Sequence, residues 1–262
     1  MIKFFRLIRQ QLLTDNKFSK YLLYAIGEII LVVIGILVAL SLNNWNQNRI
    51  EIKKEINSLK NLSLDLEEQA ALLDTYIMLE STFYNAGHQI LKHYEKHKGF
   101  LKIDSILPNL NSLATRNTFN PINTTYEELI STGNIRIIQN ETIKREIIRY
   151  YNALERTTLV ITSNNTNLVD GIFNPVLFEQ TLFTANSSAS VGMASIQINL
   201  ESVKELHATS EKIVLDPEKA LHLFNVVKFR TNVAAGNMNR YEELHKETTV
   251  LLEAIALELG KK

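Results

Sequence analysis

The chain has 262 residues, of which 28 are Lys or Arg and 28 are Asp or Glu, so its formal net charge is zero. A neutral chain has no overall field that would attract nucleic acid or an acidic partner. Cysteine is absent, which excludes a disulfide framework, thiolate catalysis and cysteine metal sites. The 9 glycines and 4 prolines are few for this length, and their scarcity favours long uninterrupted helices.

The first 20 residues, MIKFFRLIRQQLLTDNKFSK, form a basic segment with one acidic side chain, Asp15. Its basic residues are Lys3, Arg6, Arg9, Lys17 and Lys20. Phe5, Ile8 and Leu12 would share one face of a helix, which predicts a short amphipathic helix lying on an anionic membrane surface. The alternative is a solvated basic tail that only sets the orientation of the chain.

Residues 21–42, YLLYAIGEIILVVIGILVALSL, are apolar or small apart from Glu28. As an α-helix this run would be about 33 Å long, which is enough to cross a hydrocarbon core of about 30 Å. Tyr21 and Tyr24 at one end and Trp45 just beyond the other would act as interfacial anchors at the headgroup level. The run therefore predicts a single transmembrane helix.

A cleaved signal peptide is the alternative for this run. Ala39-Leu40-Ser41 has the small-x-small pattern that a signal peptidase recognises. However, the apolar run is longer than the roughly 7–15 residues of a signal peptide, and the segment before it is long. We therefore expect the helix to remain in the mature chain.

Basic residues that flank the run predict its orientation. Five precede it, and four follow it: Arg49, Lys53, Lys54 and Lys60. Because basic flanks favour the cytoplasmic side, we expect residues 1–20 to form a cytoplasmic tail, residues 21–42 the transmembrane helix, and residues 43–262 a periplasmic domain. The chain would then be a single-pass protein of a bacterial inner membrane.

Glu28 is the one ionisable residue of the run, and a carboxyl group in lipid is costly unless it is protonated, paired or facing protein. Gly35 and Ala39 would share its helix face, and small residues four apart let two helices approach closely. This face predicts association with a second copy or with another membrane protein. Alternatively, Glu28 lies near the interface and reaches water. A proton relay would require more than this one titratable group.

An apolar seam follows the membrane run, in alternating steps of four and three residues. Its members are Ile52, Ile56, Leu59, Ser63, Leu66, Ala70, Leu73 and Ile77. This heptad spacing predicts a long helix that continues to about Lys98 and ends at Gly99 as the C′ residue. Because further helices follow that can cover the seam, we expect bundle packing before a two-chain coiled coil.

Three shorter helices are predicted next. The first contains Ile106, Leu107, Leu110 and Leu113, and the second is capped by Thr125 and ends at Gly133. Asn140 with Glu141 opens the third, which runs to about Val160. Its apolar stripe is Ile143, Ile147, Tyr150 or Tyr151, and Leu154.

The remainder of the chain predicts one long final helix after a mixed region. Residues 168–183 indicate a helix interrupted at Pro175, residues 184–192 a loop, and residues 201–209 a short helix. Asp216 followed by Pro217 is a start signal for the final helix. We expect that helix to run to Leu259 with the apolar positions Leu244, Thr248, Leu251 and Ile255, and with a break or kink at Gly236.

The helix–glycine turn–helix pattern of residues 125–152 also fits a DNA-binding helix-turn-helix. Its phosphate contacts would be Arg136, Lys144, Arg145 and Arg149. A periplasmic domain is kept away from DNA, so we interpret this stretch as a bundle corner and expect no nucleic-acid partner.

His93 and His97 are four residues apart and would share a helix face, which is a possible metal-ligand spacing. His88 does not align with them, and a third ligand would have to come from elsewhere, for example Asp104. Two ligands form an incomplete site, and the flanking charged residues favour a solvated helix face instead. We expect no metal and no cofactor. The sequence also contains no nucleophile elbow and no glycine-rich phosphate loop.

Two blocks of the chain, FFRLIRQQLLTDNKFSKYLLYAIGEIILVVIGILVALSLNNWN and TFNPINTTYEELISTGNIRIIQNETIKREIIRYYNALE, resemble an uncharacterised family of Bacteroidota membrane proteins. That family is known as domain of unknown function 6090. The resemblance covers essentially the whole chain, and the first block is its most specific part. It implies a membrane protein from that phylum, but it assigns no functional residue because the family has no established activity.

Together these observations predict an all-α fold, in which a single N-terminal transmembrane helix continues into an elongated helical bundle. The predicted function is a membrane-anchored periplasmic scaffold or accessory subunit without enzymatic activity. The alternative is a sensory or ligand-binding module. The roughly 20 residues before the span are too few for a folded output domain, so such a sensor would act through a separate membrane partner.

Overall fold

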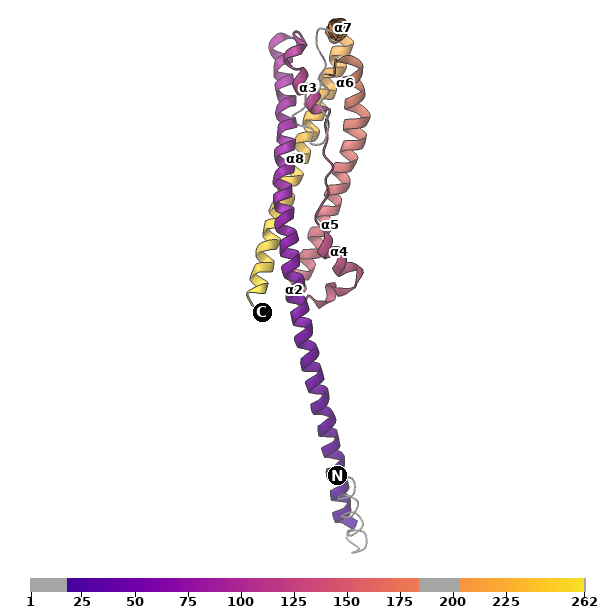
Figure 1. Cartoon of the computed structure of the whole chain (residues 1–262), viewed down its shortest axis with the longest axis vertical. Helices are drawn as coiled ribbons and strands as arrows, with labels where there is room; N and C mark the ends of the chain where they lie inside the picture. Colours follow the sequence, from indigo (N-terminus) through magenta and orange to yellow (C-terminus); the bar gives the residue numbers. More distant parts are fainter. Residues whose placement is uncertain (1–17, 184–202, 262) are drawn as a thin grey trace. The chain divides into compact units, whose positions relative to one another are not determined.

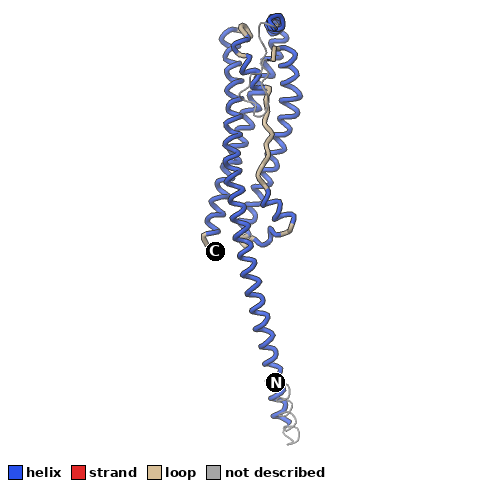
Figure 2. The backbone as a smooth tube through the Cα atoms, in the orientation of Figure 1, coloured by secondary structure: helices blue, strands red, loops and turns tan. Residues whose placement is uncertain are grey.

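The computed structural model describes residues 18–183 and 203–261, except for the side chains of residues 18–21 and Tyr24. All regular structure in these ranges is helical and none is strand (Figure 2), which confirms the all-α prediction. The predicted amphipathic helix before residue 18 and the predicted loop at residues 184–192 lie outside the described residues.

The first helix, α2, extends over Phe18–His97 and contributes to two compact units, Met1–Asn57 and Ser58–Lys262. In the first unit every residue from Ile29 to Leu42 is exposed. An 18-residue window of this helix has a mean hydropathy of 2.7, and none of it is buried. Within the described part of the chain, α2 is the one helix long and apolar enough to cross a membrane.

The second unit is a helical bundle. In this unit α2 lies lengthwise beside α8 (Pro217–Leu259) and the helical path formed by α5 (Glu141–Ser163), η3 (Asn164–Phe173) and α6 (Asn174–Gln180) (Figure 1). The shorter elements are η1 (Ile103–Ser105), α3 (Leu107–Leu113), α4 (Thr124–Ser131), η2 (Asn134–Ile137) and α7 (Lys204–Leu215).

The buried face of α2 differs in part from the predicted seam. Leu59, Leu66 and Leu73 are buried as expected, whereas Ser63, Ala70 and Ile77 lie half-buried at its edge. The positions between the three leucines are instead Leu62 and Gln69, and the face continues through Glu80 and Phe83. A pattern built on apolar residues misses this face because two of its positions are polar.

The end of α2 is shifted by one residue from the prediction. Lys98, not Gly99, has the left-handed conformation, with φ of 57°. The Gly99 N–H then donates to the Tyr94 carbonyl at 3.2 Å. This is the hydrogen bond that the C″ residue makes in a Schellman motif, so Lys98 is C′ and Gly99 is C″.

Two predicted helix starts are confirmed by their capping bonds. The Asn140 side chain accepts hydrogen bonds from the backbone N–H groups of Thr142 and Ile143. The Asp216 carboxylate accepts from Glu218 and Lys219, with Pro217 in the first turn of α8.

Other predicted boundaries were wrong. Helix α4 starts at Thr124 rather than after Thr125, and the Thr125 N–H donates to Asp65 of α2 at 2.8 Å. The helical path of η3 and α6 begins before residue 168 and ends at Gln180, and Pro175 lies in the first turn of α6. Helix α8 passes Gly236 without interruption.

Helices α2 and α8 approach closely at Gly87. A Cβ atom at that position would lie 1.9 Å from Thr231 Oγ1 and 2.9 Å from Thr231 Cβ. A side chain at Gly236, by contrast, would meet nothing within 4 Å. Gly87 therefore permits the helix contact, whereas Gly236 has no packing role among the described residues.

The bundle has two apolar clusters along its length. One includes Phe83, Ile90, Leu110, Phe173 and Leu223. The other includes Leu66, Leu73, Phe119, Tyr150, Tyr151, Tyr241 and Leu251. On α2 the residue between the clusters is Glu80, and on α8 it is Asn237, so polar side chains separate the two parts of the core.

Candidate functional site

The most unusual feature of the bundle is a non-helical segment, residues 115–123, that joins α3 to α4 along the length of the helices (Figure 2). Backbone N–H and C=O groups that are buried outside a helix or sheet need other hydrogen-bonding partners. In this segment the partners are polar side chains from the surrounding helices. We call the five buried residues that serve or support it the polar layer: Gln69, Glu80, Asn165, Arg230 and Asn237.

Helix α2 binds this segment at its middle and near its α4 end. Gln69 Oε1 accepts a hydrogen bond from the Ile122 N–H at 2.7 Å. The Tyr76 hydroxyl donates to the Thr118 carbonyl at 2.5 Å. The polar residue within the α2 seam is thus explained by a backbone group that a leucine would leave unpaired.

Helices η3 and α8 bind the end of the segment that follows α3. Arg230 of α8 donates through Nε to the Leu113 carbonyl and through Nη2 to the Thr115 carbonyl, each at 3.2 Å. Asn165 Nδ2 donates to the Asn117 carbonyl at 2.8 Å. The Arg230 contact also places a cation at the C-terminus of α3, where the helix dipole favours positive charge.

Arg230 and Glu80 form a buried ion pair. Their side chains are 2% and 6% exposed, and Arg230 Nη1 lies 3.9 Å from Glu80 Oε2. The guanidinium carbon is 4.9 Å from the centre of the Phe83 ring, a distance suited to a cation–π contact. Asn237 Nδ2 donates to Glu80 Oε1 at 3.3 Å, and Asn164 Nδ2 donates to Asn237 Oδ1 at 2.8 Å.

Burial dominates the electrostatics of this pair. It raises the pKa of Glu80, although the charge of Arg230 and the hydrogen bond from Asn237 act in the opposite direction. Burial also lowers the pKa of Arg230, against the effect of Glu80. Among the described residues, Glu80 Oε2 and Arg230 Nη1 have no hydrogen-bond partner. These residues hold the backbone of the non-helical segment against the helices and place the Arg230–Glu80 pair inside the bundle.

The predicted association face lies in the first unit, on α2. Glu28 is half-buried, Gly35 and Ala39 are exposed, and a Cβ at Gly35 would meet nothing within 4 Å. Trp45 is 64% exposed. The side chains of the other predicted anchors, Tyr21 and Tyr24, lie outside the described residues.

The two predicted metal-ligand histidines lie side by side at the end of α2, with ring centres 4.5 Å apart. His93 Nε2 is 2.7 Å from the Leu101 carbonyl, so this nitrogen carries the proton and donates. Ser105 Oγ lies 3.5 Å from the other nitrogen. Asp104, suggested as a third ligand, forms an ion pair with His207 of α7 instead.

Sequence patterns carry little information about the polar layer and none about the Asp104–His207 pair. Asp104 and His207 belong to segments far apart in the chain, and their neighbouring residues follow no ligand motif. The polar layer has one weak signal, since Gln69 and Glu80 interrupt the buried face of α2 between Leu59 and Phe83, whose other buried residues are apolar.

No match to the chain was found among the curated proteins or among the solved structures. A family model matches residues 28–208, a range that includes most of the membrane-length run and all of the non-helical segment, and it confirms the resemblance seen in the sequence. The chain belongs to this family, a family of unknown function (DUF6090).

Proposed function

We propose that this protein is a membrane-anchored helical scaffold or accessory subunit, which presents its bundle to partners and is held in the bilayer by the first part of α2. The observation that carries the proposal is that the apolar window of α2 is entirely uncovered by protein. The apolar helix of a soluble core would be mostly buried, whereas a membrane helix exposes such residues to lipid.

The distribution of basic residues supports an orientation for this anchor. Five basic residues precede the apolar run and four follow it within a short distance. On the positive-inside rule, the proposed arrangement has residues 1–20 in the cytoplasm, residues 21–42 in the inner membrane and residues 43–262 in the periplasm. Protease added to spheroplasts should therefore cleave the bundle, and its protection from the protease would contradict this orientation.

Association through the membrane helix is the second part of the proposal. Glu28, Gly35 and Ala39 lie on one face of α2, and the open space at Gly35 would admit a second helix. A carboxyl group at membrane depth is less costly when it faces protein than when it faces lipid, and a second helix on this face would place protein beside Glu28. The partner helix belongs either to a second copy of the chain or to a different membrane protein.

A matched pair of glycine variants tests this face. Gly35→Leu fills the proposed contact, whereas Gly27→Leu adds the same side chain on another face, where a Cβ would also meet nothing within 4 Å. We expect Gly35→Leu and Glu28→Gln to reduce crosslinking and oligomer mass in mild detergent, with Gly27→Leu unchanged. A self-associated wild type identifies a second copy, and a monomer that co-purifies with a membrane protein identifies a different partner. Equal behaviour of both glycine variants would contradict the proposal.

The polar layer favours a second candidate, a sensory module that acts through a membrane partner. A buried ion pair contributes little net stability, and here Glu80 of the pair lies with Asn237 between the two apolar clusters of the core. Such a core could hold two arrangements whose balance a ligand shifts. A thermal-shift screen on the full chain tests this function, because a ligand that selects one arrangement would raise the melting temperature.

A further inference from the structure

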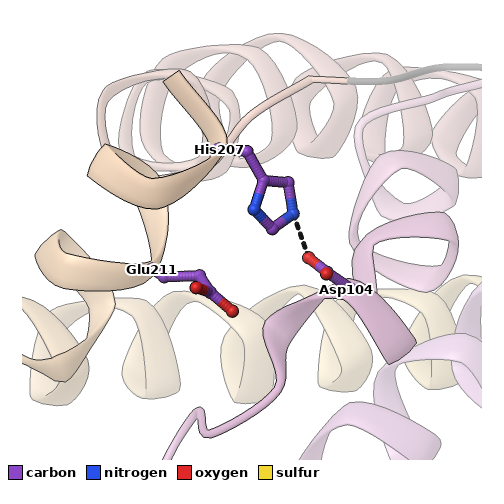
Figure 3. Close-up of side chains that lie close together, drawn as sticks. All are labelled: Asp104, His207 and Glu211. Atoms are coloured by element: carbon purple, nitrogen blue, oxygen red, sulfur yellow. Dashed lines mark ion pairs between the residues drawn. The ribbon is translucent and has the colours of Figure 1, made fainter. Parts of the chain in front are cut away.

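Three potential metal ligands meet outside the polar layer. Asp104 of η1 and His207 and Glu211 of α7 each offer one ligand atom, and these atoms all lie within 4.8 Å of one another. Figure 3 shows the His207 ring directed at the Asp104 carboxylate, with the Glu211 carboxylate facing the same space. His207 Nε2 and Asp104 Oδ1 form an ion pair.

The position of these residues on α7 follows from how that helix packs. Val214 and Ser210 are buried on its inner face. The Ser210 hydroxyl accepts a hydrogen bond from the Leu182 N–H at 3.1 Å. His207 and Glu211 are one helical turn apart, so their side chains are neighbours on the surface of α7. Both are half-buried, which places them beside the inner face.

We propose that Asp104, His207 and Glu211 bind one divalent transition-metal ion, Zn²⁺, which fastens α7 to η1. All three residues lie within the second unit, so the proposed site does not depend on membrane anchoring or on association through α2.

The donor set suits Zn²⁺ in kind and number. Zn²⁺ accepts imidazole nitrogen and carboxylate oxygen together, and sites with three protein ligands keep a further position for water. Mg²⁺ and Ca²⁺ prefer six or more oxygen ligands, and this cluster supplies two carboxylates. Zn²⁺ binds the neutral form of an imidazole, so the proton between His207 and Asp104 is released when the ion binds. The two carboxylates then carry two negative charges, which a divalent cation neutralises.

Side-chain rotation can bring the three ligand atoms to the separations found in a zinc site. Ligand atoms about 2.0–2.1 Å from a tetrahedral Zn²⁺ are about 3.3–3.4 Å from one another. The largest separation here is 4.8 Å or less, so the widest pair must approach by up to about 1.5 Å. The Asp104 side chain is 60% exposed and has room to move into this position. The Glu211 side chain is long and has several rotatable bonds.

A metal ion would add to the contacts that hold α7 on the bundle, because this helix buries few apolar side chains. Val214 is the one fully buried apolar side chain described in this helix, and Leu206 and Leu215 are 59% and 53% exposed. A helix of 12 residues has little stability of its own in water. Bound Zn²⁺ should therefore slow the local opening of α7 more than that of the rest of the bundle.

The primary test is calorimetric titration of Zn²⁺ into the full chain in detergent, with any affinity tag removed. We expect saturable binding of one ion per chain. Asp104→Asn, Glu211→Gln and His207→Ala should each weaken binding by about tenfold or more, since losing even a residue that only orients a metal ligand costs about 10–100-fold. Mg²⁺ should not compete.

Two histidine variants are matched controls. His97→Ala removes a ligand of the alternative pair at the end of α2, and His245→Asn alters a His–Asp pair, 3.3 Å apart, that has no third ligand in the described residues. Both should bind Zn²⁺ as the wild type does. The absence of saturable binding to the wild type, or equal binding by the ligand variants and the controls, would overturn the proposal.

Hydrogen exchange provides a second readout, which shows where in the chain the bound ion acts. Zn²⁺ should slow amide exchange in residues 204–215 of the wild type, and it should not change the exchange of the same residues in the Glu211→Gln variant. Glu211 is partly exposed, so its substitution by Gln preserves the shape of the side chain without disturbing the core. Slowing that is equal in both proteins would contradict a metal bridge at this site.

Discussion

Replacing Arg230 with Met should strongly destabilise the bundle. The substitution keeps a long apolar side chain but removes the two hydrogen bonds to the Leu113 and Thr115 carbonyls. It also leaves Glu80, whose side chain is 6% exposed, without its buried cation. Hydrogen bonds to a charged donor contribute about 1.5–3 kcal/mol each, and breaking a buried ion pair costs about 3–5 kcal/mol in all. These costs overlap, and we expect a total of about 4 kcal/mol.

The assay is thermal unfolding of the full chain in mild detergent, followed by circular dichroism. For a domain of about 200 residues, 1 kcal/mol corresponds to about 2–4 °C in melting temperature, so Arg230→Met should melt about 8–16 °C below the wild type. Arg230→Lys keeps the charge but not the planar fork, and it should fall between the two.

The double variant Glu80→Gln/Arg230→Met separates the ion pair from the rest of the interaction. Removing the unpaired carboxylate should restore part of the stability that Arg230→Met loses. A double variant no more stable than Arg230→Met, or a loss below about 1 kcal/mol in Arg230→Met, would refute the role assigned to this pair.

Three further predictions concern stability of the full chain. Burial raises the pKa of Glu80 above 4.5, so its protonated form is favoured by folding and the stability it contributes is lost as pH rises through the folded-state pKa. The wild type should therefore gain stability relative to Glu80→Gln as pH falls from neutrality toward 4.5. Each tenfold increase in proton affinity on folding corresponds to about 1.4 kcal/mol of unfolding free energy. A difference in urea unfolding between the two proteins that does not change with pH would contradict this. Gly87→Ala should cost about 1–3 kcal/mol through overpacking, whereas Gly236→Ala should stabilise by up to about 1 kcal/mol, and equal melting temperatures would refute the close contact. The Tyr150 hydroxyl donates to the Thr248 hydroxyl at 2.8 Å, whereas the Tyr151 hydroxyl has no partner among the described residues. Tyr150→Phe should therefore lower the free energy of unfolding in denaturant by about 1 kcal/mol, and Tyr151→Phe should not lower it.

Local signals in the sequence identified most of the helices. Asn140 and Asp216 both cap helices through the side-chain bonds expected of them, because capping depends on a few adjacent residues. The apolar positions Leu244, Leu251 and Ile255 are buried as predicted. Such features require no knowledge of which segments meet.

Features that depend on contacts between distant segments were not predictable. Gln69 and Glu80 are buried because the non-helical segment and Arg230 lie opposite them. The Asp104–His207 pair is formed by tertiary packing of η1 against α7, and no local spacing encodes it.

Membrane retention is tested most directly by alkaline carbonate extraction of membranes from cells that express the full chain. We predict that the protein stays in the membrane pellet, is released by detergent, and retains residues before Ala39-Leu40-Ser41 when its N-terminus is sequenced. Recovery of the protein in the carbonate supernatant, or an N-terminus at or beyond that tripeptide, would contradict anchoring by a retained helix.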